Sequence, residues 1–103
     1  MLYHYYEGCN IRLPQERLEH LLGQHPYMGG REWAIRETVE SPDEVRVSNQ
    51  DERVKLYYRW YNTSEIDNKF ICVVVRTLES DAFVVTAYPT ERVKRGELVW
   101  RRS

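Results

Sequence analysis

The hydrophobic pattern of this chain changes its period once, near residue 44, and this change limits the possible folds more than any other feature. Before it, apolar residues recur at the spacing of one helix face. After it, apolar and polar residues alternate, as is typical of strands. The chain is therefore expected to form its helices first and its strands second, in an α+β fold.

The first helix is expected to begin after Pro14, because proline is tolerated in the first helical turn. It should end near His25, because Pro26 disfavours helical geometry at the preceding residue. Its apolar face is formed by residues at i, i+3, i+4 and i+7, namely Leu18, Leu21, Leu22 and His25. His25 should therefore lie at a helix end, where it can be half buried and still reach a cleft.

A second helix is predicted from about Arg31 to Glu40, with an apolar side formed by Trp33, Ile35 and Val39. Four strands are predicted behind it, at residues 45–48, 54–61, 70–78 and 82–88. Their connections are too short for parallel crossovers, which need a dozen or more residues. The predicted architecture is thus two N-terminal helices packed on a four-stranded antiparallel sheet, with residues 92–100 adding a terminal turn or edge strand.

The length of 103 residues predicts a single domain over 1–103, with its core at about 12–100. The longest apolar run covers only residues 70–75, whereas a membrane-spanning helix needs roughly 20 residues. No secretory signal is legible at the N-terminus, so we expect a cytoplasmic protein without a membrane partner. Cys9 and Cys72 form no CxxC pair, so neither a disulfide nor a zinc site is predicted.

Charge is distributed unevenly along the chain, although the formal net charge is only −1. Residues 1–53 contain six Lys/Arg and ten Asp/Glu, and residues 54–103 contain nine and six. The basic C-terminal segment could meet an anion, or it could be an ordinary solvated tail. If it binds RNA, Arg92 and Lys94 are the predicted contacts.

No phosphate-binding glycine loop or metalloprotease motif is present. His20 and His25 are five positions apart, which separates them by about 140° on a helix and makes a shared metal ion improbable. No cofactor or metal is therefore predicted. The remaining inventory of His, Arg, Tyr and Thr suits metal-independent RNA cleavage, in which a 2′-OH attacks the adjacent phosphate.

His25 is the candidate proton-transfer group, because its unperturbed pKa lies near 6.5. Arg17 precedes it by two helical turns and could share its groove. Thr86 and Tyr88 alternate with apolar residues, so their hydroxyls should project from one face of the last long strand. Tyr57 and Arg59, together with Tyr61, form a possible base-stacking platform.

Each candidate also has an ordinary structural interpretation that the residues leave open. His25 could be a satisfied histidine at a helix terminus, and Arg17 a plain surface arginine. Thr86 and Tyr88 could be a β-favouring threonine and a packed tyrosine. Tyr57 and Arg59 could belong to an amphipathic face turned to solvent.

An ordered series of segments matches a known pattern: Arg17, His25-Pro26 with Met28, SPDEV at 41–45, LYY at 56–58, ICVVV at 71–75 and VTAYPTER at 85–92, followed by Lys94 and Gly96. Over about residues 12–100 this series resembles the phage-type nuclease domains that are grouped with barnase, EndoU, the RNase colicins and RelE. The resemblance implies two helices on a four-stranded antiparallel sheet. It also implies a metal-independent endoribonuclease, of the kind found in toxin modules.

The resemblance implies functional positions residue by residue. His25 matches the histidine that closes the first helix, Thr86 the hydroxyl of the Thr-Ala-Tyr strand and Arg17 the helical arginine, while Tyr88 and Arg92 are weaker matches. A toxin of this type would have RNA as its substrate and a small antitoxin protein as its partner. The alternatives are a non-catalytic adaptor with the same fold and an RNA-binding protein that does not cut. The slightly acidic composition departs from the basic character usual for a free ribonuclease.

Overall fold

The structure is a computed structural model that describes residues 2–4, 10–93 and 96–102. Within these residues it contains two α-helices, α1 (Gln15–Gln24) and α2 (Glu32–Glu40), and a 3₁₀ turn, η1 (Pro26–Met28). The same residues form seven strands: β1 (Leu2–His4), β2 (Asn10–Arg12), β3 (Glu44–Val47), β4 (Val54–Tyr61), β5 (Lys69–Leu78), β6 (Asp81–Thr90) and β7 (Glu97–Arg101). The predicted α+β class is confirmed.

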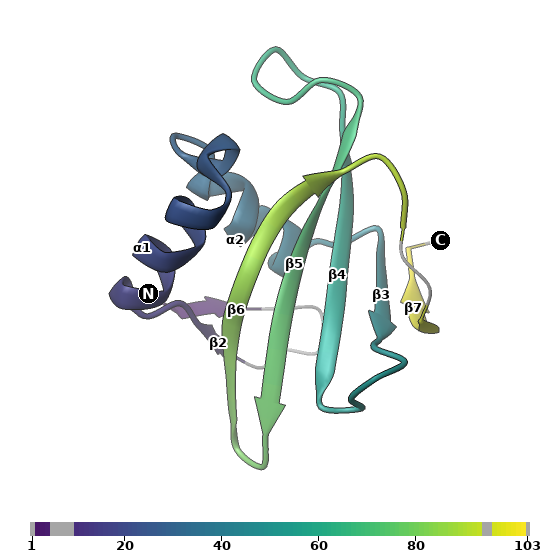
Figure 1. Cartoon of the computed structure of the whole chain (residues 1–103). Helices are drawn as coiled ribbons and strands as arrows, with labels where there is room; N and C mark the ends of the chain where they lie inside the picture. Colours follow the sequence, from purple (N-terminus) through teal and green to yellow (C-terminus); the bar gives the residue numbers. More distant parts are fainter. Residues whose placement is uncertain (1, 5–9, 94–95, 103) are drawn as a thin grey trace.

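All described strands belong to one sheet with the order β1-β2-β6-β5-β4-β3-β7, and both helices lie on the same side of it (Figure 1). The four predicted strands correspond to β3, β4, β5 and β6, which pair as an antiparallel meander. The prediction of a sheet limited to four antiparallel strands was incomplete. Two short strands, β1 and β2, extend one edge of the sheet, where β2 pairs with β6 in parallel at Arg12 and Phe83. At the other edge, β7 pairs with β3.

The helix boundaries follow the local chemistry that the sequence indicated. Pro14 precedes α1, and His25 ends it with φ −131° and ψ 75°, outside the helical region. Pro26 then begins η1, whose last residue, Met28, is fully buried. In α2, Ile35 and Val39 face the core as predicted, whereas Trp33 is 41% exposed.

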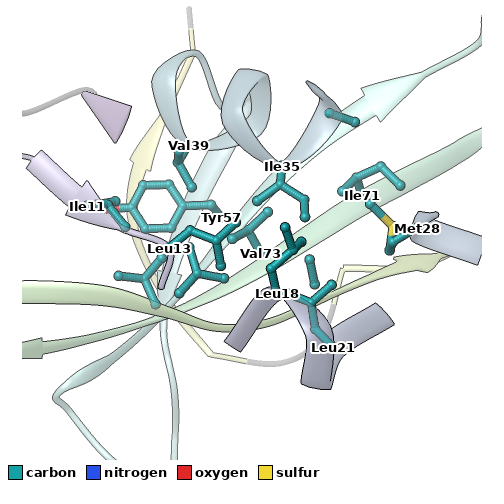
Figure 2. Packing of buried hydrophobic residues seen from close by; sticks show 14 of the residues in the cluster. Ile11, Leu13, Leu18, Leu21, Met28, Ile35, Val39, Tyr57, Ile71 and Val73 are labelled. Carbon is teal, nitrogen blue, oxygen red and sulfur yellow. The ribbon is translucent and has the colours of Figure 1, made fainter. Parts of the chain in front are cut away.

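The main core lies between the two helices and the sheet (Figure 2). Leu18 and Leu21 of α1 and Ile35 of α2 meet side chains of the central strands there, among them Tyr57, Ile71 and Val73. Tyr57 and Tyr61 of β4 both belong to this core. The odd-numbered side of β4 therefore faces the helices, and the even-numbered side faces away from them.

A β-bulge in β6 sets which of its side chains reach the core. Val74 pairs with Thr86 but Val75 pairs with Val84, so β6 has one residue more than its partner at this point. Val84 and Ala87, three positions apart, are consequently both buried in the main core. Because strict alternation from Val84 onward would have turned Thr86 toward the helices, the bulge is what keeps Thr86 and Tyr88 on the opposite face.

The segment after β6 brings the chain to the opposite edge of the sheet, where β7 pairs with β3 (Figure 1). Arg46 of β3 links to the residue before β7, because its guanidinium donates a hydrogen bond to the Gly96 carbonyl at 3.0 Å. Gly96 suits the close approach, since a Cβ there would lie 2.7 Å from the Val47 carbonyl oxygen. No helix among the described residues is long and apolar enough to span a membrane.

Candidate functional site

The sheet face turned away from the helices, here called the open face, has a second small apolar cluster. Its buried members are Leu56, Tyr58 and Cys72 from the two central strands. Tyr88 of β6 packs on this cluster from one side. Val93, in the segment after β6, also packs on it. The open face is thus a packed surface, partly covered by Tyr88 and Val93, that can support a binding site.

A pocket of about 590 Å³ lies on the open face. Its apolar floor is formed by Leu56 and Val74, which are neighbours across β4 and β5. Thr86 and Tyr88 line it from β6. The remaining lining residues, Ser48, Asn49 and Gln50, come from the loop between β3 and β4. A volume of this size is in the range of small-molecule and cofactor sites, and five of the seven lining residues carry a hydroxyl or an amide group.

His25, at the end of α1, contacts Tyr88 but is not itself one of the residues that line the pocket. Its ring centroid lies 5.5 Å from that of Tyr88, with an angle of 34° between the ring planes. The described pairing of β2 with β6 is limited to Arg12 and Phe83 and does not extend to Tyr88. Both α1 and η1, the elements on either side of His25, contact β6. The structure therefore brings three predicted site residues into one neighbourhood: His25 touches Tyr88, and Tyr88 shares the pocket with Thr86.

Tyr88 is held in its neutral form. Burial is the largest cause that raises the pKa of its phenol, and the neighbouring Cys72 thiol and Tyr58 raise the pKa further. The hydroxyl therefore stays protonated at neutral pH. In that state it can donate a hydrogen bond, and the Cys72 thiol is a hydrogen-bond partner of it in this structure.

The raised pKa of Tyr88 predicts how the protein responds to alkali. Tyr88→Phe should leave unchanged the tyrosinate absorbance that develops near pH 10, about the pKa of a free tyrosine, because Tyr88 does not ionise there while the protein is folded. The unfolded chain does ionise there, so Tyr88 stabilises the fold below about pH 10 and this stability falls as the pH rises further. Loss of one tyrosine's worth of absorbance in the variant at pH 10 would contradict this.

The Thr86 hydroxyl oxygen is buried and has no hydrogen-bond partner within the part of the chain that the structure describes. A buried polar group without a partner is destabilising by about 1–3 kcal/mol, so native proteins retain few of them. Thr86 lines the pocket next to Tyr88. A hydroxyl kept there at a cost to stability fits a role in binding.

The predicted basic residues are not all brought to this site. Arg17 is half buried on α1 and lines a separate pocket with Glu16 and His20. No contact between Arg17 and His25 is found among the described residues. Arg92 is exposed just after β6, and its backbone N–H donates to the Thr90 hydroxyl. Lys94 lies outside the described residues.

The predicted base-stacking platform on β4 is wrong. Tyr57 is fully buried in the main core and offers no face to a nucleotide. Arg59 is a structural tie, because it pairs with Glu37 of α2 at 3.3 Å and donates to the Ser41 carbonyl at 2.6 Å. The physical reason is that the helices cover the odd-numbered side of β4, which the sequence analysis assigned to RNA contacts.

Trp60, a residue that the sequence analysis did not single out, is the exposed ring of β4. It has the even-numbered parity of Leu56 and Tyr58, so it lies on the open face. Its side chain is 44% exposed and packs at 5.0 Å, edge to face, on Phe70. The alternation of residues 54–61 already placed Trp60 on one face of the strand. Which of the two faces is exposed depends on where the helices pack, and the sequence does not show that.

Comparison with known proteins gave no match: no family model matches this chain, and no curated protein or solved structure was found to be significantly similar to it. Among the described residues, no group of three or more His, Cys, Asp or Glu side chains is placed to hold a metal ion.

Proposed function

We propose that this protein is a metal-independent endoribonuclease whose active site is the pocket of the open face. The observation that carries this proposal is the contact between His25 and Tyr88, beside Thr86 and an open pocket. An imidazole and two neutral hydroxyls supply the groups that RNA cleavage by the 2′-OH needs. These groups come from segments more than sixty positions apart in the sequence.

In the proposed reaction, His25 accepts the proton of the 2′-OH as this oxygen attacks the adjacent phosphorus atom. The bond from phosphorus to the 5′-oxygen breaks, and that oxygen leaves with a proton from water or from a protonated side chain. Tyr88 and Thr86 donate hydrogen bonds to the phosphate oxygens, where negative charge increases in the transition state. The products are a 2′,3′-cyclic phosphate and a 5′-hydroxyl.

No charged side chain lines the pocket, so a cation that attracts the phosphate has to come from outside its walls. Arg46 pairs with Glu44 at 2.9 Å, and Arg76 pairs with Asp51 at 3.4 Å, so both cations already have an acidic partner. The guanidinium of Arg92 has no partner among the described residues, and it follows the Thr-Ala-Tyr strand directly. We assign to Arg92 the attraction of the RNA backbone, which is expected to weaken with salt.

The resemblance to phage-type nuclease domains supports a further part of the proposal, that the enzyme acts as the toxin of a toxin–antitoxin pair. A stand-alone toxin of this type would need a protein that neutralises it. Such an antitoxin would be expected to cover the open face, where Trp60 and Leu98 expose apolar surface.

The proposal is tested by incubating the purified protein with a labelled single-stranded RNA in excess EDTA. We expect cleavage that EDTA does not reduce, with products that end in 2′,3′-cyclic phosphate. An all-deoxy strand of the same sequence should stay intact, because it lacks the attacking oxygen. Cleavage that is lost in EDTA would contradict the metal-independent mechanism.

The other outcomes of this experiment separate the alternatives. Salt-sensitive binding of RNA without product would indicate an RNA-binding protein that does not cut. If the protein neither binds nor cleaves the RNA, the result favours the adaptor and overturns the proposed activity.

A further inference from the structure

The loop between β3 and β4 lines one wall of the pocket with amide side chains. Leu56 of β4 lines the same pocket. Asn49 and Gln50 are exposed and line the pocket. Neither side-chain amide has a hydrogen-bond partner among the described residues. Each amide can donate and accept at once, which is the pattern that nucleobase edges present.

The backbone of this loop is held in place by several interactions. The Ser48 N–H donates to the Val54 carbonyl at 2.9 Å, and the Gln50 N–H donates to the Ser48 hydroxyl at 3.2 Å. Asp51 accepts from the Arg53 N–H at 2.9 Å and from the Arg76 guanidinium at 3.4 Å. The two amides are therefore presented by a preformed turn, which lowers the entropic cost of binding.

The chemistry of this wall fits a base and not a phosphate. The hydrogen bonds from Arg53 hold the pKa of Asp51 below its usual range, so the carboxylate stays charged and pairs with both Arg53 and Arg76. None of the residues that line the pocket carries a charge, so this wall offers no cation to a phosphate. The floor beside the amides, Leu56 and Val74, is apolar and suits the face of an aromatic ring.

We propose that the 48–50 loop and the apolar floor form a subsite for one unpaired nucleobase, in which Asn49 and Gln50 read its hydrogen-bonding edge. The inference rests on the proposed function, since it takes RNA as the ligand. A nucleotide whose phosphate lies at Tyr88 and Thr86 would place a neighbouring base in the same pocket. Asn49 and Gln50 would then determine which sequence is cut, and His25 would act on any sequence.

The test uses labelled RNA pentamers UUNUU, with N as each of the four bases and 2′-fluoro in place of each 2′-OH so that cleavage cannot occur. We expect the protein to bind one pentamer about 10-fold more tightly than the weakest, in the range of one good base contact. The double variant Asn49→Ala/Gln50→Ala should reduce this ratio below about 2-fold. Asn62→Ala, an exposed asparagine at the other end of β4, is the matched control and should keep it.

The results separate this inference from the proposed function. If unmodified RNA is cleaved but the double variant keeps the base preference, the nuclease stands and the subsite is overturned. Equal binding of all four pentamers by the unmodified protein also overturns the subsite. If no pentamer binds and no RNA is cleaved, both proposals fail. Circular dichroism of each variant verifies that the fold is retained.

Discussion

Replacing His25 with alanine is expected to lower the rate of RNA cleavage by roughly 10²–10⁴-fold, the usual contribution of a positioned acid–base group. The fold should survive, because His25 is only half buried and its described side-chain interaction is the ring contact with Tyr88. Initial rates on a labelled single-stranded RNA, with thermal unfolding in parallel, measure both effects.

His20→Ala is the matched control for this variant. His20 is exposed on the same helix and lies beside Arg17, away from the pocket of the open face. Its replacement should leave the rate within about 2-fold, as expected for a surface residue without a role in proton transfer. Equal rates for the His25 variant and the unmodified enzyme would show that the active site is elsewhere, and Arg17 with His20 would become the next candidates.

Replacing Tyr57 with alanine is expected to lower the free energy of unfolding by about 3–5 kcal/mol, the range for large aromatic residues in a core. Tyr57 is fully buried between α2 and the sheet, beside Val39 and Val73 (Figure 2). The alanine would leave a cavity that the surrounding side chains cannot fill. Urea unfolding followed by circular dichroism gives the value.

Trp60→Ala provides the contrast on the same strand. Trp60 is 44% exposed, so its loss should cost far less stability than the loss of Tyr57. If Trp60 stacks on RNA, its variant should instead weaken binding, typically by about 1–3 kcal/mol per stacked base. A stable Tyr57 variant with impaired RNA binding would reverse the assignment of the two faces made here.

Much of the fold was predictable because hydrophobic period depends on local sequence. The regular spacing of Leu18 and Leu21 predicted α1, and the alternation in residues 54–61 predicted β4. Pro26 placed the helix end at His25, which the backbone angles confirm. β1 and β2 were missed because three residues are too few to show a period, and the parallel pairing of Arg12 with Phe83 depends on tertiary contacts.

The candidate site was less predictable, because alternation defines two faces of a strand without saying which one the helices cover. For β4 the choice was wrong, and Tyr57 proved to be core while Trp60 is exposed. For β6 the grouping of Thr86 with Tyr88 was right, although Val84 proved to share a side with Ala87. The contact of His25 with Tyr88 depends on where α1 ends beside the sheet, which no periodicity records.

The bulge in β6 also affects how the length of this strand can vary in evolution. Val85 is the residue that β5 does not match, so its deletion would restore regular pairing between the two strands. Val84 and Ala87 would still face the helices, and Thr86 and Tyr88 would still face the pocket. A homologue with a one-residue gap at this position would therefore keep both hydroxyls in place. Such a gap alone would not indicate that the homologue has lost the site.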